Sequence, residues 1–146
     1  MIGEYVVDLG SGGGLPGIPL AITNPQKQFL LVESNTKKAS FLLNTVTKLN
    51  LHNTEVINDR IENIDSSNFP DRFDIVSRAV GSIEANIALT EQLLKKKGVY
   101  LKLMKTEDQF FKEHLPTGYN VKKIDKYLTK TKDKTRILVT IEKVQQ

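Results

Sequence analysis

The sequence predicts a doubly wound α/β fold, with a mostly parallel sheet, helices on both faces and an antiparallel C-terminal edge. Short apolar runs alternate with amphipathic stretches along the 146 residues, and this alternation is typical of parallel sheets with crossover helices. A short charged hairpin separates the last two strand-like runs, so they must pair antiparallel. The length is that of one domain, and we expect residues 1–146 to form it.

The N-terminal half alternates apolar strands with helices. Strands are expected at 5–9, 29–32 and 54–57, where apolar and β-branched residues form short runs. A short helix is expected at 15–22, with Pro16 in its first turn. The next helix starts at a cap formed by Asn35 or Thr36 and runs to Leu49. The apolar face expected of that helix comprises Ala39, Phe41, Leu42, Val46 and Leu49.

The second half continues the alternation. A strand at 73–77 follows the turn signal Pro70-Asp71. The helix that starts near Ile83 ends at 95–98, where lysines meet the negative helix end and Gly98 supplies a cap. Further elements are expected at 99–104 (strand), 106–114 (helix), 121–128 (strand) and 136–142 (strand).

Composition excludes several kinds of site. The chain has no cysteine, which excludes disulfides, cysteine-rich zinc sites and a cysteine nucleophile. Its two histidines lie far apart in sequence, so we expect no metal. No apolar run approaches the ~20 residues that span a bilayer, and no signal-peptide pattern is present. We therefore expect a cytoplasmic monomer without a membrane partner.

Positive charge is concentrated in the C-terminal third. Residues 1–94 carry 7 Lys/Arg against 11 Asp/Glu, whereas residues 95–146 carry 14 against 6. The excess is densest at Lys122, Lys123, Lys126, Lys130, Lys132, Lys134 and Arg136. Such a field attracts polyanions, including RNA, although a solvated lysine-rich hairpin would have the same composition.

A glycine loop, residues 10–17, follows the first strand and holds five glycines. In open α/β sheets, ligands bind at the carboxyl ends of the strands, and glycine lets the backbone approach them closely. Glu33 ends the second strand, where a carboxylate can accept hydrogen bonds from both hydroxyls of a ribose. The loop therefore predicts a site for a nucleoside-containing cofactor.

Two cofactors compete for this site. The spacing Gly12-x-Gly14-x-x-Gly17 matches the dinucleotide fingerprint. However, Asp8 would repel a pyrophosphate and suits the ammonium group of a methionine moiety. S-adenosylmethionine carries positive charge and no phosphate, so the pattern Asp8, Gly10, Gly12, Gly14 favours it over a nicotinamide cofactor.

Three further positions follow predicted strands at the same sheet edge. Ile61 is expected to cover an adenine ring and Glu62 to bind its amino group, although an ordinary surface turn fits this position too. Arg78 can hold a phosphate or the O6/N7 edge of a base; a structural ion pair with an aspartate is the alternative. Lys105 is a candidate ligand for a substrate phosphate, with a plain exposed lysine as its alternative.

Residues 8–20, DLGSGGGLPGIPL, resemble the signature of the bacterial 16S ribosomal RNA guanine-N7 methyltransferases, also called the glucose-inhibited division protein B family. The resemblance continues at 31–34, 37–39, 41–42, 60–62, 73–74, 77–79, 104–105 and 136–143. It implies a class I S-adenosylmethionine-dependent methyltransferase, with a Rossmann-like fold. Family members usually carry a helical segment before the first strand, which this sequence lacks, and commonly have glycine where this sequence has Thr106.

The resemblance also implies residue roles. It implies cofactor contacts at Gly10, Leu15, Glu33, Ile61, Glu62 and Arg78. The implied reaction is in-line transfer of the sulfonium methyl group to guanine N7 in 16S ribosomal RNA of the small subunit, with Arg78 and Lys105 anchoring O6 or phosphates. The N7 lone pair needs no general base, so catalysis would come from positioning and electrostatics. The alternatives are an RNA- or ribosome-binding module without catalysis, and a methyltransferase acting on a protein or small molecule.

Overall fold

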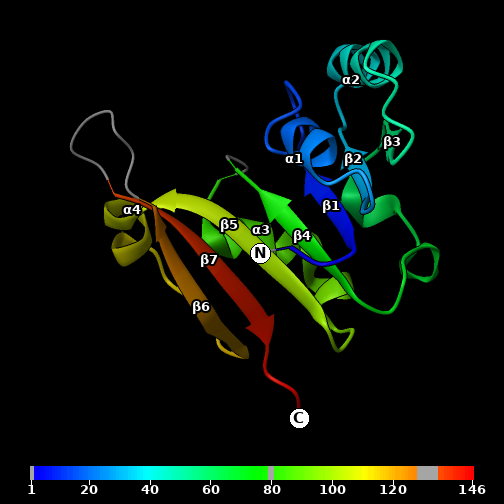
Figure 1. The fold of residues 1–146 in the computed structure, drawn as a ribbon. Helices are drawn as coiled ribbons and strands as arrows, with labels where there is room; N and C mark the ends of the chain where they lie inside the picture. The colour runs from blue at the N-terminus through cyan, green and yellow to red at the C-terminus, as the bar shows by residue number, and fades with distance from the viewer. Residues whose placement is uncertain (1, 79–80, 128–134) are drawn as a thin grey trace.

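The computed structural model describes residues 2–78, 81–127 and 135–146, which form one mixed sheet flanked by helices (Figure 1). The strands are β1 Tyr5–Leu9, β2 Gln28–Val32, β3 Thr54–Ile57, β4 Phe73–Ser77, β5 Val99–Thr106, β6 Tyr119–Tyr127 and β7 Arg136–Lys143. The helices are α1 Gly17–Thr23, α2 Thr36–Lys48, α3 Ile83–Leu94 and α4 Glu107–Lys112, with short 3₁₀ helices η1 Ile61–Asn63 and η2 Ser66–Asn68.

The sheet order is β3-β2-β1-β4-β5-β7-β6. The first five of these strands pair in parallel, whereas β7 pairs antiparallel with both β5 and β6. The predicted fold class, including the antiparallel C-terminal edge, is confirmed. The chain order reverses between β1 and β4, which makes this the switch point of the sheet, where α/β folds place their ligands.

Alternate residues of β1 face opposite layers of the molecule. Val6 lies in an apolar cluster with Ala21 of α1, and Val7 lies in the main core with Ile83 and Ile87 of α3. Both faces of the central strands are therefore covered, as the continuous apolar runs of those strands require.

The apolar face predicted for α2 is partly wrong. Ala39, Leu42 and Val46 are buried, but Phe41 is 54% exposed and Leu49 is 49% exposed. Leu49 follows the last helical residue, as the C-cap. Phe41 is adjacent to Leu42, and adjacent helical residues point in directions about 100° apart. The N-terminal cap is Asn35, whose side chain accepts a hydrogen bond from the Lys38 amide.

Two other helix starts also show how the sequence sets the boundaries. Pro16 is the residue that precedes α1 and does not lie in its first turn. Thr106 caps α4: its hydroxyl accepts from the Gln109 amide, and the Gln109 side chain accepts from the Thr106 amide. This reciprocal capping box fixes where β5 gives way to α4.

Candidate active site

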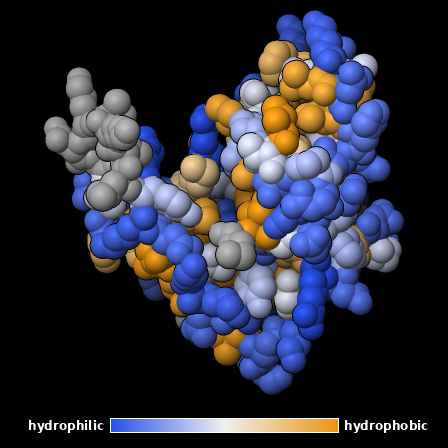
Figure 2. Space-filling model, in the orientation of Figure 1, coloured by the Kyte–Doolittle hydropathy of each residue, from blue (hydrophilic) through white to orange (hydrophobic). Residues whose placement is uncertain are grey.

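The carboxyl ends of β1 to β5 meet at one edge of the sheet, beside α1 and α4 (Figure 1). Figure 2 shows that the molecule is hollowed above this edge, between the side formed by α1 and α2 and the side formed by α4 and the β6–β7 pair. The glycine loop, Glu33, Ile61, Arg78 and Lys105 all come from this edge. The predicted site residues therefore all lie at the carboxyl edge of the sheet, on both sides of the switch point.

The glycine loop is folded tightly against β2. The Gly10 amide donates to the Val32 carbonyl at 2.9 Å, and the Gly14 amide donates to the Ser11 carbonyl at 2.8 Å. Gly14 has a φ of +89°, and a Cβ added there would lie 2.5 Å from Ile18 Cδ1. A Cβ added at Gly13 would meet nothing within 4 Å. The loop is thus packed at its end and open at its middle, where a ligand can approach the backbone.

Asp8 is a buried carboxylate at the base of the loop, 1% exposed. Its Oδ2 accepts from the Gly17 amide at 2.8 Å, and its Oδ1 has no hydrogen-bond partner among the described residues. Burial raises the pKa of Asp8 to about 6, and the contacts with Ser11 and the Gly17 amide, together with the nearby Arg78 charge, only partly oppose this. An acceptor oxygen left without a donor in a buried site is costly, and a cationic ligand would satisfy it.

Gly17 is the residue that allows this arrangement. A Cβ at Gly17 would lie 2.5 Å from Asp8 Oδ2 and 2.4 Å from Leu31 Cδ2. Only glycine brings the first amide of α1 within hydrogen-bond distance of the Asp8 carboxylate. The third glycine of the dinucleotide-like spacing therefore serves the contact between helix and strand.

Glu33 is also buried, 7% exposed, immediately after β2. Its Oε1 accepts from the Gly12 amide at 3.1 Å, and its Oε2 accepts from the Asn35 amide at 3.2 Å. The carboxylate is thus held against the open middle of the glycine loop. This position fits the ribose-binding role predicted for it, because each oxygen has lone pairs left for a hydroxyl.

The residues predicted to contact adenine differ in exposure. Ile61 starts η1 and is 4% exposed in the main core, whereas Glu62 is exposed. Both line a hollow of about 240 Å³ between η1 and α3. Leu15, on the glycine loop, is 45% exposed. Ile61 is therefore tied to the core, and its predicted contact with an adenine ring stays a prediction.

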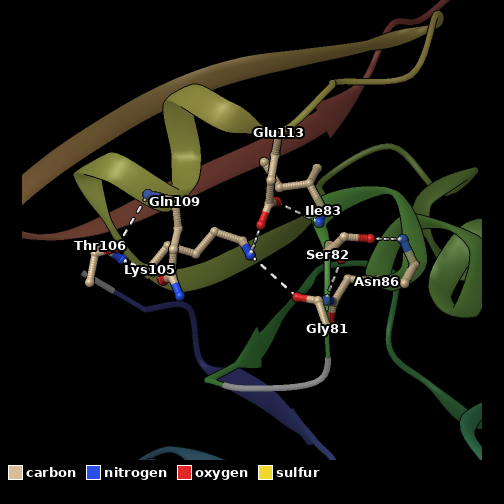
Figure 3. Close-up of polar contacts among 9 residues, drawn as sticks. Gly81, Ser82, Ile83, Asn86, Lys105, Thr106, Gln109 and Glu113 are labelled. Carbon is tan, nitrogen blue, oxygen red and sulfur yellow. Dashed lines mark hydrogen bonds and ion pairs between the residues drawn. The ribbon is translucent and has the colours of Figure 1, made fainter.

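Arg78 and Lys105 have different surroundings. Arg78, the residue after β4, is exposed. The Lys105 side chain is only 9% exposed, and its Nζ donates to Glu113 Oε1 at 2.8 Å and to the Gly81 carbonyl at 3.3 Å (Figure 3). Lys105 is thus a partnered lysine and not the plain exposed one that was its alternative.

Glu113 is the residue that sequence reasoning missed. Its Oε2 accepts from the Ile83 amide at 2.8 Å, in addition to the Lys105 contact. No sequence signal marks it, because α4 reverses the chain between Lys105 and Glu113, and Ile83 lies 30 residues away.

The lysine-rich segment 122–136, called the basic hairpin here, has several of its charges paired with carboxylates. Three β6 lysines pair with carboxylates: Lys122 with Glu142 at 3.2 Å, Lys123 with Asp125 at 2.7 Å and Lys126 with Glu107 at 2.5 Å. Lys130, Lys132 and Lys134 lie outside the described residues. Exposed pairs of this kind are weak, so a polyanion can still compete for these lysines.

The described residues can be searched for a metal-binding group and for a membrane-spanning helix. Within residues 2–78, 81–127 and 135–146, no three His, Asp or Glu side chains gather in a way that could hold a metal ion. In the same ranges, no helix has the length and apolar character needed to cross a membrane.

Comparison with known proteins adds three findings. The family model described as rRNA small subunit methyltransferase G matches residues 2–139. A protein of that name from Hydrogenovibrio crunogenus is 37% identical over 145 residues, covering 98% of this chain and 65% of the relative. Another from Legionella pneumophila is 44% identical over 99 residues, covering 68% of this chain and 47% of the relative. The chain thus spans about half to two thirds of the length of these relatives.

A solved structure has the same fold at low identity. It is an rRNA methylase from Streptococcus thermophilus, 18% identical, with a TM-score of 0.62 over 97% of this chain and 87% of that chain. Likeness at this identity supports the fold alone, and it agrees with the mixed sheet described above.

Proposed function

Because this chain belongs to the rRNA small subunit methyltransferase G family, we propose that it transfers a methyl group from S-adenosylmethionine to N7 of a guanine in 16S ribosomal RNA. The proposal takes residues 1–146 as one cofactor-binding domain. Its partner is the RNA of the small ribosomal subunit, and it acts as a cytoplasmic monomer.

The observation that carries the proposal is the pair of buried carboxylates on either side of the glycine loop. Asp8 presents an oxygen without a partner, and Glu33 lies against the Gly12 amide. Two negative groups oppose binding of a pyrophosphate and favour a ligand with a cationic head and a ribose. S-adenosylmethionine has both, so the donor and acceptor set fits it better than NAD.

The residues that would hold the cofactor follow from this fit. Asp8 would attract the methionine ammonium, Glu33 would bind the ribose, and Gly10, Gly12 and Gly14 would leave room for it along the loop. Leu15, Ile61 and Glu62 would contribute the remaining contacts. When bound, the cofactor supplies an electrophilic methyl group on a sulfonium.

The protein's share of the chemistry is positioning. Guanine N7 has a free lone pair in the ring plane, so no side chain has to remove a proton. Arg78, exposed beside the Asp8 site, would hold O6 or a phosphate and set the angle of approach. The carboxylates at the same edge would oppose the positive charge that the ring gains.

The decisive test is methyl transfer to 16S ribosomal RNA and to assembled small subunits, with nucleosides analysed by mass spectrometry. We expect N7-methylguanosine to form with wild-type protein and Arg78→Ala to reduce the rate by about 100-fold. Arg72→Ala is the matched control, because Arg72 precedes β4 at the opposite edge of the sheet. Cofactor binding without methylation of RNA, or a methyl group on another atom, would contradict the proposal.

A further inference from the structure

We propose that Lys105 and Glu113 form a positioning pair that holds the backbone at Gly81 and at the start of α3, shortly after Arg78 in the sequence, and that Lys105 does not bind a substrate phosphate. The inference rests on the proposed function, since Arg78 is the residue whose placement the pair would control. It replaces the phosphate-binding role predicted for Lys105 from the sequence.

The pair joins three elements at the carboxyl edge (Figure 3). Lys105 lies near the end of β5, Glu113 follows α4, and their charged groups meet at 2.8 Å. From there, Lys105 donates to the Gly81 carbonyl at 3.3 Å, and Glu113 accepts from the Ile83 amide at 2.8 Å. The backbone at both ends of Ser82 is therefore held by one ion pair.

This contact also completes the start of α3. The Ser82 hydroxyl accepts from the Ala85 amide, and Glu113 accepts from the Ile83 amide. Both bonds satisfy amides that an isolated helix leaves unpaired, and the Glu113 charge suits the positive end of the helix dipole. Gly81 has a φ of +89°, which a side chain would strain, so its carbonyl is held in an uncommon backbone conformation.

Burial argues against a phosphate-binding role for Lys105. Its side chain is 9% exposed, and two acceptors already occupy its ammonium. To reach a phosphate, Lys105 would have to leave Glu113, whose side chain is itself only 21% exposed. Separating a partly buried ion pair is unfavourable because each charge loses its partner in a place where water cannot replace it.

The chain supplies its own control for this inference. Lys126 and Glu107 form a second lysine–glutamate pair that joins a strand to α4, at 2.5 Å. In that pair the lysine side chain is 63% exposed, compared with 9% for Lys105. Breaking this pair removes a similar contact without touching Gly81 or the start of α3.

The test is a double-mutant cycle in the whole chain with Lys105→Met, Glu113→Gln and both changes together. Glu107→Gln is the control, and Lys105→Arg tests rescue. We would measure kcat and KM for RNA methylation, RNA affinity between 50 and 200 mM salt (roughly the range over which phosphate contacts are resolved), and hydrogen exchange of the Ile83 amide at a temperature where each variant is folded.

The inference predicts that each single change lowers kcat by about 10- to 100-fold and that the double variant is no worse than either. The Ile83 amide exchanges faster in both singles, the salt dependence of RNA affinity is unchanged, and Lys105→Arg recovers most of kcat. Glu107→Gln behaves as wild type.

A phosphate-binding lysine gives a different pattern. Lys105→Met would then raise KM and reduce the salt slope by about one, while Glu113→Gln would leave kcat intact. That result overturns the inference. If wild-type protein transfers no methyl group to RNA, the proposed function fails, and the salt slope and Ile83 exchange still decide whether Lys105 is a positioning residue.

Discussion

The glycine-loop side of the sheet and its antiparallel edge hold their charged groups differently. On the loop side, Asp8 and Glu33 are buried and bound by backbone amides of nearby turns. On the antiparallel edge, the three β6 lysines are exposed and bound by other side chains. Backbone donors are fixed by the fold, whereas exposed side-chain pairs rearrange readily. The first region is thus preorganised for a small ligand, and the second can adapt to a large one.

The largest effect on stability is expected at Gly17. Replacing it with alanine puts a Cβ 2.5 Å from Asp8 Oδ2 and 2.4 Å from Leu31 Cδ2, which shifts α1 and breaks its bond to Asp8. We expect a loss of about 3–4 kcal/mol in the free energy of unfolding, measured by urea denaturation. Gly13→Ala is the control, since nothing lies within 4 Å of its added Cβ. Equal stability of the two variants would show that the loop side is not preorganised.

The next largest effect is expected at Lys105. Its ion pair with Glu113 is largely buried, unlike the exposed lysine pairs of β6 on the same side of the sheet. Lys105→Met leaves Glu113 without its cation and should lower the free energy of unfolding by about 2–3 kcal/mol. Thermal and urea unfolding would measure it. A loss below about 0.5 kcal/mol would place this pair with the weak surface pairs.

A change of opposite sign is expected at Asp8. Its pKa in the folded state is raised to about 6 by burial, so the folded protein binds a proton between about pH 4 and 6 that the unfolded chain has released. Stability contributed by this group is therefore present below about pH 4 and is lost as pH rises through 6. Asp8→Asn should remove this dependence and raise the free energy of unfolding by about 2–3 kcal/mol at pH 7.

Urea denaturation at pH 4, 5, 6 and 7 would test the Asp8 prediction. Asp8→Asn should also weaken cofactor binding, because a stabilising change at a binding site commonly removes a function. A variant less stable than wild type at pH 7 would mean that the Asp8 charge is already compensated in the folded protein.

The smallest effect is expected at Lys126. Its pair with Glu107 is exposed, so Lys126→Met should leave the melting temperature unchanged within error and weaken RNA binding slightly at low salt. Filter binding at two salt concentrations measures this. A clear drop in melting temperature would show that the antiparallel edge also depends on fixed contacts.

These two regions also differ in how well the sequence predicts them. The ends of β1, β3 and β4, a helix cap at Asn35 or Thr36, and the gathering of Asp8, Gly10, Gly12, Gly14 and Glu33 at one edge could be predicted. Each of these depends on neighbours in sequence or on one rule for parallel sheets. The placement of β7 between β5 and β6 could not, since hairpin pairing fixes direction and leaves open which strand lies at the edge.

Contacts between side chains far apart in sequence also could not be predicted. The role of Glu113 depends on α4 bringing it to Lys105 and to the start of α3, and no local pattern carries that information. Phe41 shows the limit of periodicity, because an apolar residue beside the buried stripe of α2 need not be covered.

We expect the carboxyl edge beside Asp8 and Glu33 to bind S-adenosylmethionine. Calorimetric titration of the wild-type chain with S-adenosylmethionine, with NAD as the competing ligand and Glu33→Gln as the variant, tests it most directly. We expect one bound S-adenosylmethionine, no binding of NAD, and affinity about 10-fold weaker in the variant, as loss of one charge-assisted hydrogen bond would cause. Binding of NAD, or S-adenosylmethionine binding that ignores Glu33, would contradict it.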